Sequence, residues 1–294
     1  MVSIIITTYK EPITLEKTIK NILKERIDQK FEILVVAPDK ESREVVNKKF
    51  VQYPQIKFLP DKGEGKPAAL NLAFQKARGE ILVLTDGDVI VEKGSINKLL
   101  KHFQNKRVGA VSGRPISLSP RKKMLGYWSH WLLNAAHQRR LDLSKKKKYF
   151  DCSGYLYAIR SNIVREIPKN TFSDDIYISR KIWQANYKIS YEPEAKVGVK
   201  YPSTFSDWLK QKRRSAGGAI QFKTKNRELK TRNFLKEGWY GLKLFFSFPK
   251  NLKEFFWTIL LFLARIYLWI IIFIDLKIRR KEFKEIWIRI ESSK

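Results

Sequence analysis

The stretch GKPAALNLAFQKARGEILVLTDGDV, residues 65–89, decides the fold class because it runs from a helix into a strand and then into an acidic turn. Its apolar spacing predicts a helix from Ala68 to Ala77. The mostly apolar segment Glu80–Thr85 is typical of a strand that is covered on both faces. A helix that leads directly into such a strand indicates a βαβ unit with parallel strands.

The same alternation continues outward on both sides of this stretch. Over the first 115 residues we expect strands at Val2–Thr8, Phe31–Ala37, Ile56–Leu59, Glu80–Thr85 and Val108–Ser112, and helices at 13–25, 40–50, 68–77 and 94–104. Beyond them we expect a helix at 123–143, a strand at Phe150–Ile159, a helix at 175–187, a short strand at Ile189–Tyr191 and a basic, partly helical segment at 205–237. The sequence therefore predicts an α/β fold with a mostly parallel sheet flanked by helices.

The composition indicates a folded protein with an anionic partner. The 294 residues are 44% hydrophobic, which is enough for a sizeable core. Lys and Arg number 59 against 29 acidic residues, a net charge of +30 that predicts nucleic acid, an anionic membrane or phosphorylated substrates as partners. The single cysteine, Cys152, excludes an internal disulfide. Because no basic segment precedes an apolar one at the start of the chain, we expect no secretory signal and a cytosolic active site.

Acidic residues follow several of the expected strands. Glu11 follows the first, Asp39 the second, and Asp86 and Asp88 the fourth. Ligands bind at the carboxyl ends of the strands in open α/β sheets, so we expect these carboxylates to converge there. Carboxylates that repel one another suit a bound Mg²⁺ or Mn²⁺. The Asp-Gly-Asp sequence is also a common turn, and by itself it leaves both interpretations open.

Three further motifs have both a structural and a chemical interpretation. The loop DKGEGKPAALN, residues 61–71, is either a plain turn or an anion site with Lys66 at a helix start. Phe172–Asp175 either caps a helix or holds a general base. Gln211–Ser215 is either an exposed basic helix or a diphosphate clamp.

In this order and spacing, the motifs resemble those of the family 2 glycosyltransferases, which are inverting enzymes of the GT-A fold. The resemblance runs from Val2 to about Gly218. It is carried by VSIIITTYKEP, GKPAALNLAFQKARGEILVLTDGDV, AVSGRP, FSDDIYISRKIWQANYKISYEPEA and QKRRSAGG.

The resemblance implies a role for each matching residue. Asp175 would be the catalytic base and Asp88 the ligand of Mg²⁺ or Mn²⁺. Other residues would bind the nucleotide sugar, with UDP favoured over GDP: Thr8, Tyr9, Glu11, Asp39, Lys66 and Asp86. Asp174, Gln211 and Arg214 would contact the diphosphate and the acceptor.

Three positions depart from the family's motifs. Ser215 stands where processive members carry Trp, which puts processive polymerisation in doubt. Ser173 and Asp174 replace the usual Glu-containing lead to the base, a mild change. Residues 37–39, Ala-Pro-Asp, replace the more common Asp-Asp-Gly-Ser, so the contacts to the donor base can differ.

The C-terminal part of the chain is apolar. Residues 255–274, FFWTILLFLARIYLWIIIFI, hold one charge, Arg265, and as a helix they would extend about 30 Å, the thickness of a bilayer core. The Leu, Ile and Phe residues contribute about −4 to −8 kcal/mol to insertion, against about +3 kcal/mol for the arginine. Trp239–Phe248 is too short to span a bilayer and suits the interface between membrane and water.

From these segments we expect a catalytic domain at 1–230, a membrane-associated helical tail at 231–294 and an enzyme at the cell membrane, with its catalytic domain on the cytoplasmic side. A buried core helix is the alternative for residues 255–274.

The charges that flank residues 255–274 argue against a simple crossing. Seven basic residues follow the apolar segment: Lys277, Arg279, Arg280, Lys281, Lys284, Arg289 and Lys294. The 20 residues before it hold only Lys236, Lys243, Lys250 and Lys253. Because basic flanks favour the cytoplasmic side, we expect 255–274 to lie in or re-enter one leaflet.

Two other functions remain as alternatives. One is a processive polysaccharide synthase of the cellulose or hyaluronan type, which the single clear span does not favour. The other is a nucleic-acid-binding protein, suggested by the charge alone. The sequence has no zinc pattern, no RNA-binding aromatic strand and no helix-turn-helix signature, and its charge is spread along the chain.

Overall fold

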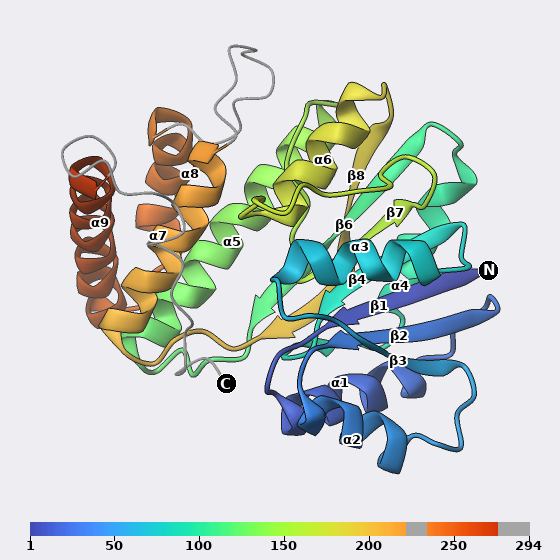
Figure 1. Ribbon diagram of the computed structural model, residues 1–294. Coiled ribbons are helices and arrows are strands. Elements are labelled where there is room, and N and C mark those ends of the chain that lie inside the picture. The colour runs from blue at the N-terminus through green and yellow to red at the C-terminus, as the bar shows by residue number, and fades with distance from the viewer. Residues whose placement is uncertain (222–233, 276–294) are drawn as a thin grey trace. The chain divides into compact units, whose positions relative to one another are not determined.

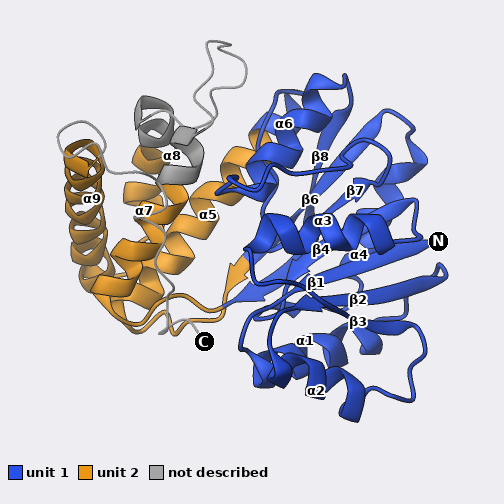
Figure 2. Cartoon of the chain, viewed as in Figure 1, with its two compact units in different colours: residues 1–115, 143–199 blue, residues 116–142, 200–294 orange. Residues whose placement is uncertain are grey.

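The structure is a computed structural model that describes residues 1–221 and 234–275. The chain forms two compact units (Figure 1, Figure 2). Unit 1 comprises residues 1–115 and 143–199, and unit 2 comprises residues 116–142 and 200–294. The expected boundary at residue 230 and the seven basic residues from Lys277 onward lie outside the described residues.

Unit 1 is built on one mixed sheet of eight strands in the order β3-β2-β1-β4-β7-β6-β8-β5. The strands are β1 (Val2–Thr7), β2 (Phe31–Ala37), β3 (Ile56–Pro60), β4 (Ile81–Asp86), β5 (Ile90–Val91), β6 (Val108–Ser117), β7 (Leu156–Arg160) and β8 (Lys188–Val199). β1 runs parallel to β2 and β4, with Ile4 opposite both Ile33 and Val83, and β2 runs parallel to β3. β7 is antiparallel to β4 and β6, and β5 is antiparallel to β8. The α/β class and the flanked, mostly parallel sheet of the expected fold are confirmed.

Helices cover this sheet because its strands are apolar on both faces. They are α1 (Pro12–Lys24), α2 (Lys40–Lys49), α3 (Lys66–Lys76), α4 (Ser95–Lys101, continued by a 3-10 turn at His102–Gln104) and α6 (Asp174–Gln184). α3 packs on β1 and β2, α4 on β8, and α1 against α2. Each of the first four helices leads back to the next strand, as the alternation predicted.

Two expectations for the middle of the chain were wrong in extent. The strand expected at Phe150–Ile159 begins only at Leu156, because the backbone N–H groups before it donate to side chains instead of to a neighbouring strand. Cys152 N–H donates to Ser179 Oγ and Ser153 N–H to Ser112 Oγ, both at 2.9 Å. The strand expected at Ile189–Tyr191 extends over the whole of β8.

Unit 2 is helical and aromatic. Its helices are α5 (Met124–Lys145, up to residue 142), α7 (Phe205–Gln221), α8 (Phe234–Ser247) and α9 (Leu252–Phe273). They share a buried cluster of Tyr127, Trp128, Trp131, Trp208, Leu244, Leu261 and Ala264. Asn251 begins α9 by accepting the N–H of Glu254 on its side chain at 2.9 Å. Within the described residues, α9 is the one helix long and apolar enough to cross a membrane.

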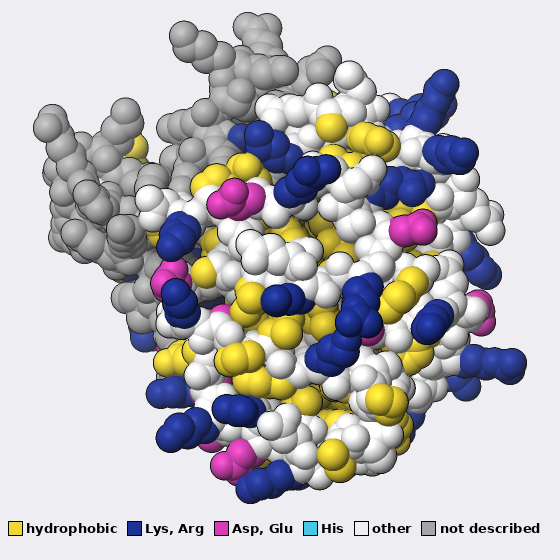
Figure 3. All heavy atoms as spheres, turned by 45° about the vertical axis from the view of Figure 1, so that its right-hand side comes forward, with side chains coloured by type: hydrophobic (Ala, Val, Ile, Leu, Met, Phe, Trp, Pro, Cys, Tyr) yellow, Lys and Arg dark blue, Asp and Glu magenta, His cyan; other side chains and the backbone are white. Residues whose placement is uncertain are grey.

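The basic side chains are scattered on the face of the molecule drawn in Figure 3. Lys and Arg lie between hydrophobic and uncharged groups on this face and do not form a continuous stripe. This agrees with a basic charge that is spread along the sequence and not gathered in one segment.

Candidate active site

The acidic turn lies where β1 and β4 end side by side in unit 1. Thr7 pairs with Asp86 in the sheet, and the N–H of Gly87 donates to the carbonyl of Thr7 at 3.0 Å. A Cβ atom on Gly87 would lie 2.6 Å from both Cβ and Oγ1 of Thr8. Only glycine therefore lets the turn approach β1 this closely and hold Asp86 and Asp88 at the carboxyl edge of the sheet.

The carboxyl group of Asp88 is short of positive charge. Burial, followed by the negative charges of Asp86 and Glu11, raises the pKa of Asp88 to about 7, although Lys66 opposes the shift. A carboxylate in this setting gains from a cation that compensates for its lost hydration. Because the negative charges of Asp86 and Glu11 both raise the pKa of Asp88, the three carboxylates lie close enough to influence one another.

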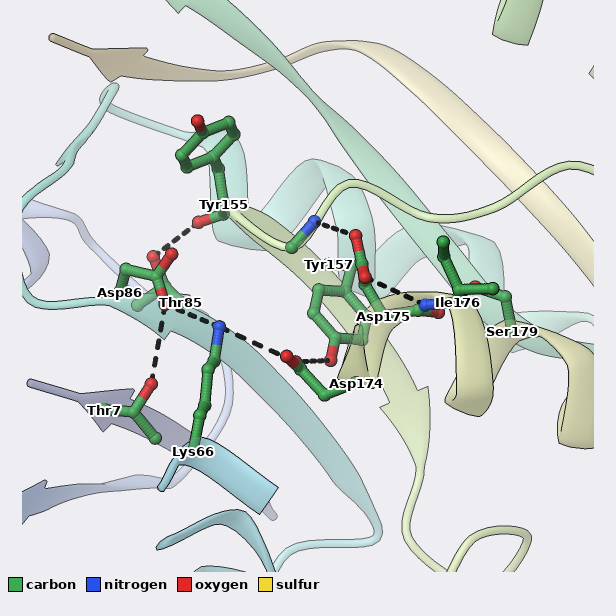
Figure 4. Close-up of polar contacts among 11 residues, drawn as sticks. Thr7, Lys66, Thr85, Asp86, Tyr155, Tyr157, Asp174, Asp175, Ile176 and Ser179 are labelled. Atoms are coloured by element: carbon green, nitrogen blue, oxygen red, sulfur yellow. Dashed lines mark hydrogen bonds and ion pairs between the residues drawn. The ribbon is translucent and has the colours of Figure 1, made fainter. Parts of the chain in front are cut away.

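Lys66 links two parts of the edge that are far apart in sequence (Figure 4). It is the first residue of α3, and its Nζ lies 2.7 Å from Asp86 Oδ1 and 3.6 Å from Asp174 Oδ2. Burial by itself would lower the pKa of Lys66, but the carboxylates of Asp174 and Asp86 outweigh it and raise the pKa. Lys66 is therefore a fixed cation between the end of β4 and the start of α6.

The carboxyl group of Asp175 is oriented by backbone N–H groups. Gly154 N–H donates to Oδ2 at 3.2 Å. Ile176 N–H donates to Oδ1 at 2.9 Å (Figure 4). Ser179 Oγ donates to the backbone carbonyl of Asp175 at 2.6 Å. Ser173 is the residue before α6, yet its side chain makes no capping hydrogen bond. The first turn of α6 is therefore not capped by Ser173, and its Ile176 N–H is accepted by Asp175 instead.

Asp39 has a structural role at the end of β2. Its Oδ1 accepts the N–H of Ser42, in the first turn of α2, and its Oδ2 accepts the N–H of Lys10, both at 2.9 Å. Burial opposes ionisation of Asp39, but these hydrogen bonds prevail and lower its pKa. Asp39 thereby fixes the loop after β1, where Lys10 has a left-handed φ of 53°.

The loop after β1 carries the other three expected pocket residues. Thr8 Oγ1 is buried and has no hydrogen-bond partner in the part of the chain that the structure describes. The ring of Tyr9 is 47% exposed, and Lys10 Nζ lies 5.5 Å from its centroid. Glu11 directly precedes α1. An unused hydroxyl and an open aromatic ring at a sheet edge are suited to ligand contacts.

Gln211 and Arg214 both lie on α7, in unit 2. They are three residues apart, so they share one face of the helix. Gln211 is buried, and its Oε1 lacks a hydrogen-bond partner among the described residues. Ser215 donates its hydroxyl to the carbonyl of Gln211 at 3.0 Å. At the position where processive family members carry Trp, this chain therefore has a small side chain that bonds to its own helix.

Sequence reasoning missed two residues of the edge. The hydroxyl of Tyr157, on β7, lies 3.4 Å from Asp174 Oδ2, and burial together with Asp174 raises the pKa of Tyr157 well above its usual value. Gly154 lies in the segment Phe150–Ile159, which was expected to be a strand, so no role in the site was predicted for it. No local signal identifies either residue, because the sheet order and the path of residues 150–155 bring them to α6.

No complete metal site is formed by the chain alone over residues 1–221 and 234–275. No three His, Cys, Asp or Glu side chains there are arranged to hold an ion. The carboxylates of Glu11, Asp86 and Asp88, which we call the acidic edge, therefore offer at most part of a coordination shell.

Two curated proteins resemble the chain over most of its length. It is 24% identical over 269 residues to the probable glycosyltransferase YdaM of Bacillus subtilis, covering 84% of this chain and 63% of that protein. It is 22% identical over 227 residues to the poly-β-1,6-N-acetyl-D-glucosamine synthase of Staphylococcus epidermidis, covering 74% and 54%. The chain thus spans less than two thirds of the length of either relative.

Solved structures share the fold. The mannosyltransferase PcManGT of Pyrobaculum calidifontis, in complex with GDP-Man and Mn²⁺, superposes with a TM-score of 0.64 at 18% identity, over 97% of this chain and 82% of that one. GalNAc-T7, with UDP, GalNAc and Mn²⁺, superposes with a TM-score of 0.52 at 18% identity, over 67% and 43%. These are glycosyltransferases of the GT-A fold, as the resemblance implied.

The family described as Glycosyltransferase like family 2 matches residues 1–218, about three quarters of the chain. This range contains every motif that carried the resemblance and all residues of the acidic edge. The chain therefore belongs to glycosyltransferase family 2.

Proposed function

We propose that the protein transfers a sugar from a nucleotide-sugar donor to a lipid-linked or glycan acceptor, with inversion, at the cell membrane. The observation that carries this proposal is the position of Lys66 between Asp86 and Asp174, with Asp175 beside them. One cation and several carboxylates at the carboxyl edge of a parallel sheet are suited to a diphosphate, its metal ion and a hydroxyl nucleophile.

The donor would lie along the ends of β1, β2 and β4. Thr8, Tyr9 and Glu11 would line the nucleotide pocket, and Asp39 would contact the base or ribose from its fixed position. Asp86 would lie near the ribose and sugar, and Lys66 along the diphosphate. UDP is favoured over GDP, and the two solved relatives, bound to GDP-Man and to UDP, make both worth testing.

The acidic edge fits a divalent cation, because the charges of Asp86 and Glu11 and burial all oppose ionisation of Asp88. Asp88 would hold Mg²⁺ or Mn²⁺, with water and the donor's phosphates as the other ligands. When bound, the ion supplies positive charge that stabilises the departing diphosphate. Both solved relatives contain Mn²⁺.

Asp175 would act as the general base. As it takes the proton of the acceptor hydroxyl, that oxygen bonds to the anomeric carbon and the bond from this carbon to the diphosphate breaks. A single displacement with one base inverts the anomeric centre. The N–H groups of Gly154 and Ile176 hold the carboxylate in one orientation for this step.

Asp174, Gln211 and Arg214 would contact the diphosphate and the acceptor. Arg214 can bind phosphate oxygens through two N–H groups at once. The unpartnered Oε1 of Gln211 can accept a hydrogen bond from a hydroxyl. Asp174 would make its contact while also pairing with Lys66, whose Nζ lies 3.6 Å from its Oδ2.

A processive synthase is the second candidate, favoured by the named activity of the staphylococcal relative. Ser215 in place of Trp argues against it, since a tryptophan would offer the growing glycan a flat surface. A ladder of long polymers made by the purified protein would decide for processivity, and single-sugar products would decide against it.

The membrane location is supported by α9 and by three lysines close to it, Lys243, Lys250 and Lys253. The catalytic domain would face the cytoplasm, where nucleotide sugars are found. The acceptor would then be presented at the membrane surface.

Nucleotide release from a panel of UDP- and GDP-sugars, with Mn²⁺ or Mg²⁺ and detergent-solubilised protein, tests the proposal. We expect release with one donor, and a loss of about 10²- to 10⁴-fold in Asp175→Asn. Asp88→Asn should lose release together with metal-dependent donor binding. Asp28→Asn, the same change at an exposed carboxylate, is the matched control. Undiminished release by Asp175→Asn would refute the assignment of the base.

A further inference from the structure

Helix α9 has two faces of opposite exposure. Large apolar side chains recur every three or four residues along one face and are exposed by about half or more, apart from Ile259 at 37%: Leu252, Phe256, Ile259, Leu263, Ile266, Tyr267, Ile270 and Phe273. We call them the outer stripe. They span about 30 Å of helix. An exposed apolar stripe of this length is far more than scattered surface residues produce.

The opposite face of α9 is fixed within unit 2. Leu261 and Ala264 join the aromatic cluster, and Trp128 Nε1 donates to the carbonyl of Trp257 at 2.7 Å. The hydroxyls of Tyr127 and Thr258 lie 2.6 Å apart. This face is therefore already covered by protein and is not available to lipid.

Ion pairs secure both ends of the covered face. Near the start of α9, the guanidinium of Arg121 donates to both carboxylate oxygens of Glu254 at 2.8 Å. Just beyond its end, Arg213 on α7 pairs with the buried Asp275. Because these partners lie at opposite ends, the helix is held lengthwise against its neighbours.

The neighbour along the second half of α9 is a basic helix. Leu209 and Ala216 of α7 pack against Leu268 and Ile272. Both helices belong to unit 2, drawn in orange in Figure 2. Between those two contacts, α7 carries four basic residues, Lys210, Lys212, Arg213 and Arg214. If α9 crossed a bilayer, this stretch of α7 would enter the hydrocarbon with it.

The insertion energies of the apolar and the basic residues together disfavour a position of α9 across the bilayer. One Lys or Arg at the centre of a bilayer offsets roughly five to ten Leu, Ile or Phe residues. The outer stripe has seven such apolar residues, whereas α7 would carry four basic side chains inward, of which Lys210 and Arg213 form ion pairs with Asp207 and Asp275. A helix that lies flat buries the stripe and leaves α7 in water.

The lysines near the outer stripe indicate which kind of membrane surface the stripe would bind. Lys250 and Lys253 flank its first residue, Leu252, in the sequence, and both are exposed, as is Lys243 on α8. Phe246 of α8 is 71% exposed, and its ring lies 6.4 Å from that of Phe255 on α9. Lys253 Nζ lies 4.9 Å from the ring centroid of Trp257. Tryptophan beside lysine is characteristic of the headgroup layer, and clustered lysines select anionic lipids.

We propose that α9 lies in the plane of one leaflet of an anionic membrane, with the outer stripe in the acyl region and Lys243, Lys250 and Lys253 among the headgroups. This inference rests on the proposed membrane location of the enzyme and specifies its geometry. The in-plane helix holds unit 2 on the membrane surface, so that α7, with Gln211 and Arg214, stays on the aqueous side.

Depth measurements along the stripe test the geometry. Full-length protein with Cys152→Ser would carry one spin label at Phe256→Cys, Leu263→Cys or Ile270→Cys, on vesicles of phosphatidylcholine with phosphatidylglycerol. We expect a similar, shallow depth at all three positions. A deep label at residue 263 with shallow labels at 256 and 270 would mean a crossing and overturn the proposal. Spin coupling between chains, without lipid contact, would identify a second copy as the occupant and overturn it as well.

Binding to the same vesicles tests the lipid partner. Leu263→Glu should weaken co-sedimentation by about tenfold or more, whereas Val51→Glu, at an apolar residue of unit 1 that is 75% exposed, should not. Equal binding by both variants would refute the stripe as the lipid contact. Nucleotide release measured on these preparations separates the two proposals, because a failed transferase assay leaves the depth profile unaffected.

Discussion

Strand β1 of unit 1 and helix α9 of unit 2 are both apolar, but folding covers them differently. Ile4, Ile5 and Ile6 of β1 are completely buried, since helices cover the sheet on both faces. On α9, Leu261 is completely buried, whereas Leu263, two residues later, is 56% exposed. The comparison teaches that an apolar segment demands burial without specifying whether protein or lipid provides it.

The polar groups of the two units differ in the same way. In unit 2, the ion pair of Arg121 with Glu254 joins the segment just before α5 to the first turn of α9. In unit 1, Asp86, Asp88 and Lys66 gather at a sheet edge, where burial and like charge raise the pKa of Asp88. This pair of unit 2 thus stabilises the packing of α9, whereas the charged groups at the edge of unit 1 gather where we propose that the ligand binds.

The largest expected effect concerns the two faces of α9. Leu261→Ala removes a side chain from the aromatic cluster and should lower the free energy of unfolding by about 2–5 kcal/mol. Leu263→Ala, on the outer stripe, should change it by less than about 0.5 kcal/mol. Denaturant unfolding of both variants in mild detergent measures the difference. Equal losses would show that α9 is buried all round.

Lys66 is expected to matter nearly as much for the edge of unit 1. Lys66→Met leaves Asp86 and Asp174 without their shared cation and should reduce nucleotide release by about 100-fold, or about 2.7 kcal/mol. The matched control is Lys48→Met, which breaks the exposed pair of Lys48 with Glu44 on α2 and should leave the rate unchanged. Similar rates in both variants would remove Lys66 from the site.

A buried carboxyl outside the site gives a pH-dependent effect. Burial raises the pKa of Glu25 to about 7 despite its hydrogen bond from Ile96 N–H at 2.6 Å. Between pH 4.5 and 7 the folded state keeps a proton that the unfolded chain has lost, so stability falls as the pH rises through this window. Glu25→Gln avoids this loss and should be more stable than the parent by about 2 kcal/mol at pH 8, with no difference at pH 4.

Thermal unfolding of Glu25→Gln across this pH range checks the expectation. Glu41→Gln, at an exposed residue of α2, serves as the control and should follow the parent at every pH. A constant difference between Glu25→Gln and the parent from pH 4 to 8 would contradict the assignment.

The smallest expected effect concerns the orientation of Asp175. A Cβ atom at Gly154 would lie 3.3 Å from Asp175 Oδ2, a tight contact that displaces the carboxylate slightly. Gly154→Ala should therefore lower kcat by about tenfold, or 1.4 kcal/mol, with an unchanged KM for the donor. A raised KM at constant kcat would assign Gly154 to donor binding instead.

Much of unit 1 could be predicted because its elements are set by local patterns. Strands β1 and β2 and helix α2 begin at the expected residues and end within one residue of the expected bounds. The sheet order could not be predicted, since β7 enters beside β4 through contacts between residues more than 70 apart in the sequence. The loop at 150–155 was mistaken for strand because its hydrogen bonds go to distant side chains.

The residues of the candidate site also fall into two groups, those that could be placed from local sequence patterns and those that could not. Asp86 and Asp88 follow a strand, and strand ends are predictable, so their position at the sheet edge followed from sequence. The approach of Lys66 to Asp174 and the N–H of Gly154 on Asp175 depend on segments that meet only after the sheet forms. Roles carried over from the family stay predictions until the variants are measured.

The sequence by itself determined the fold class, the family and the presence of an apolar C-terminal helix, because periodicity and motif order are properties of the chain. Only the tertiary structure decided which face of α9 is covered and which carboxylates share Lys66. Both depend on long-range packing, in which a side chain's partner is set by the path of the whole chain and not by its neighbours in sequence.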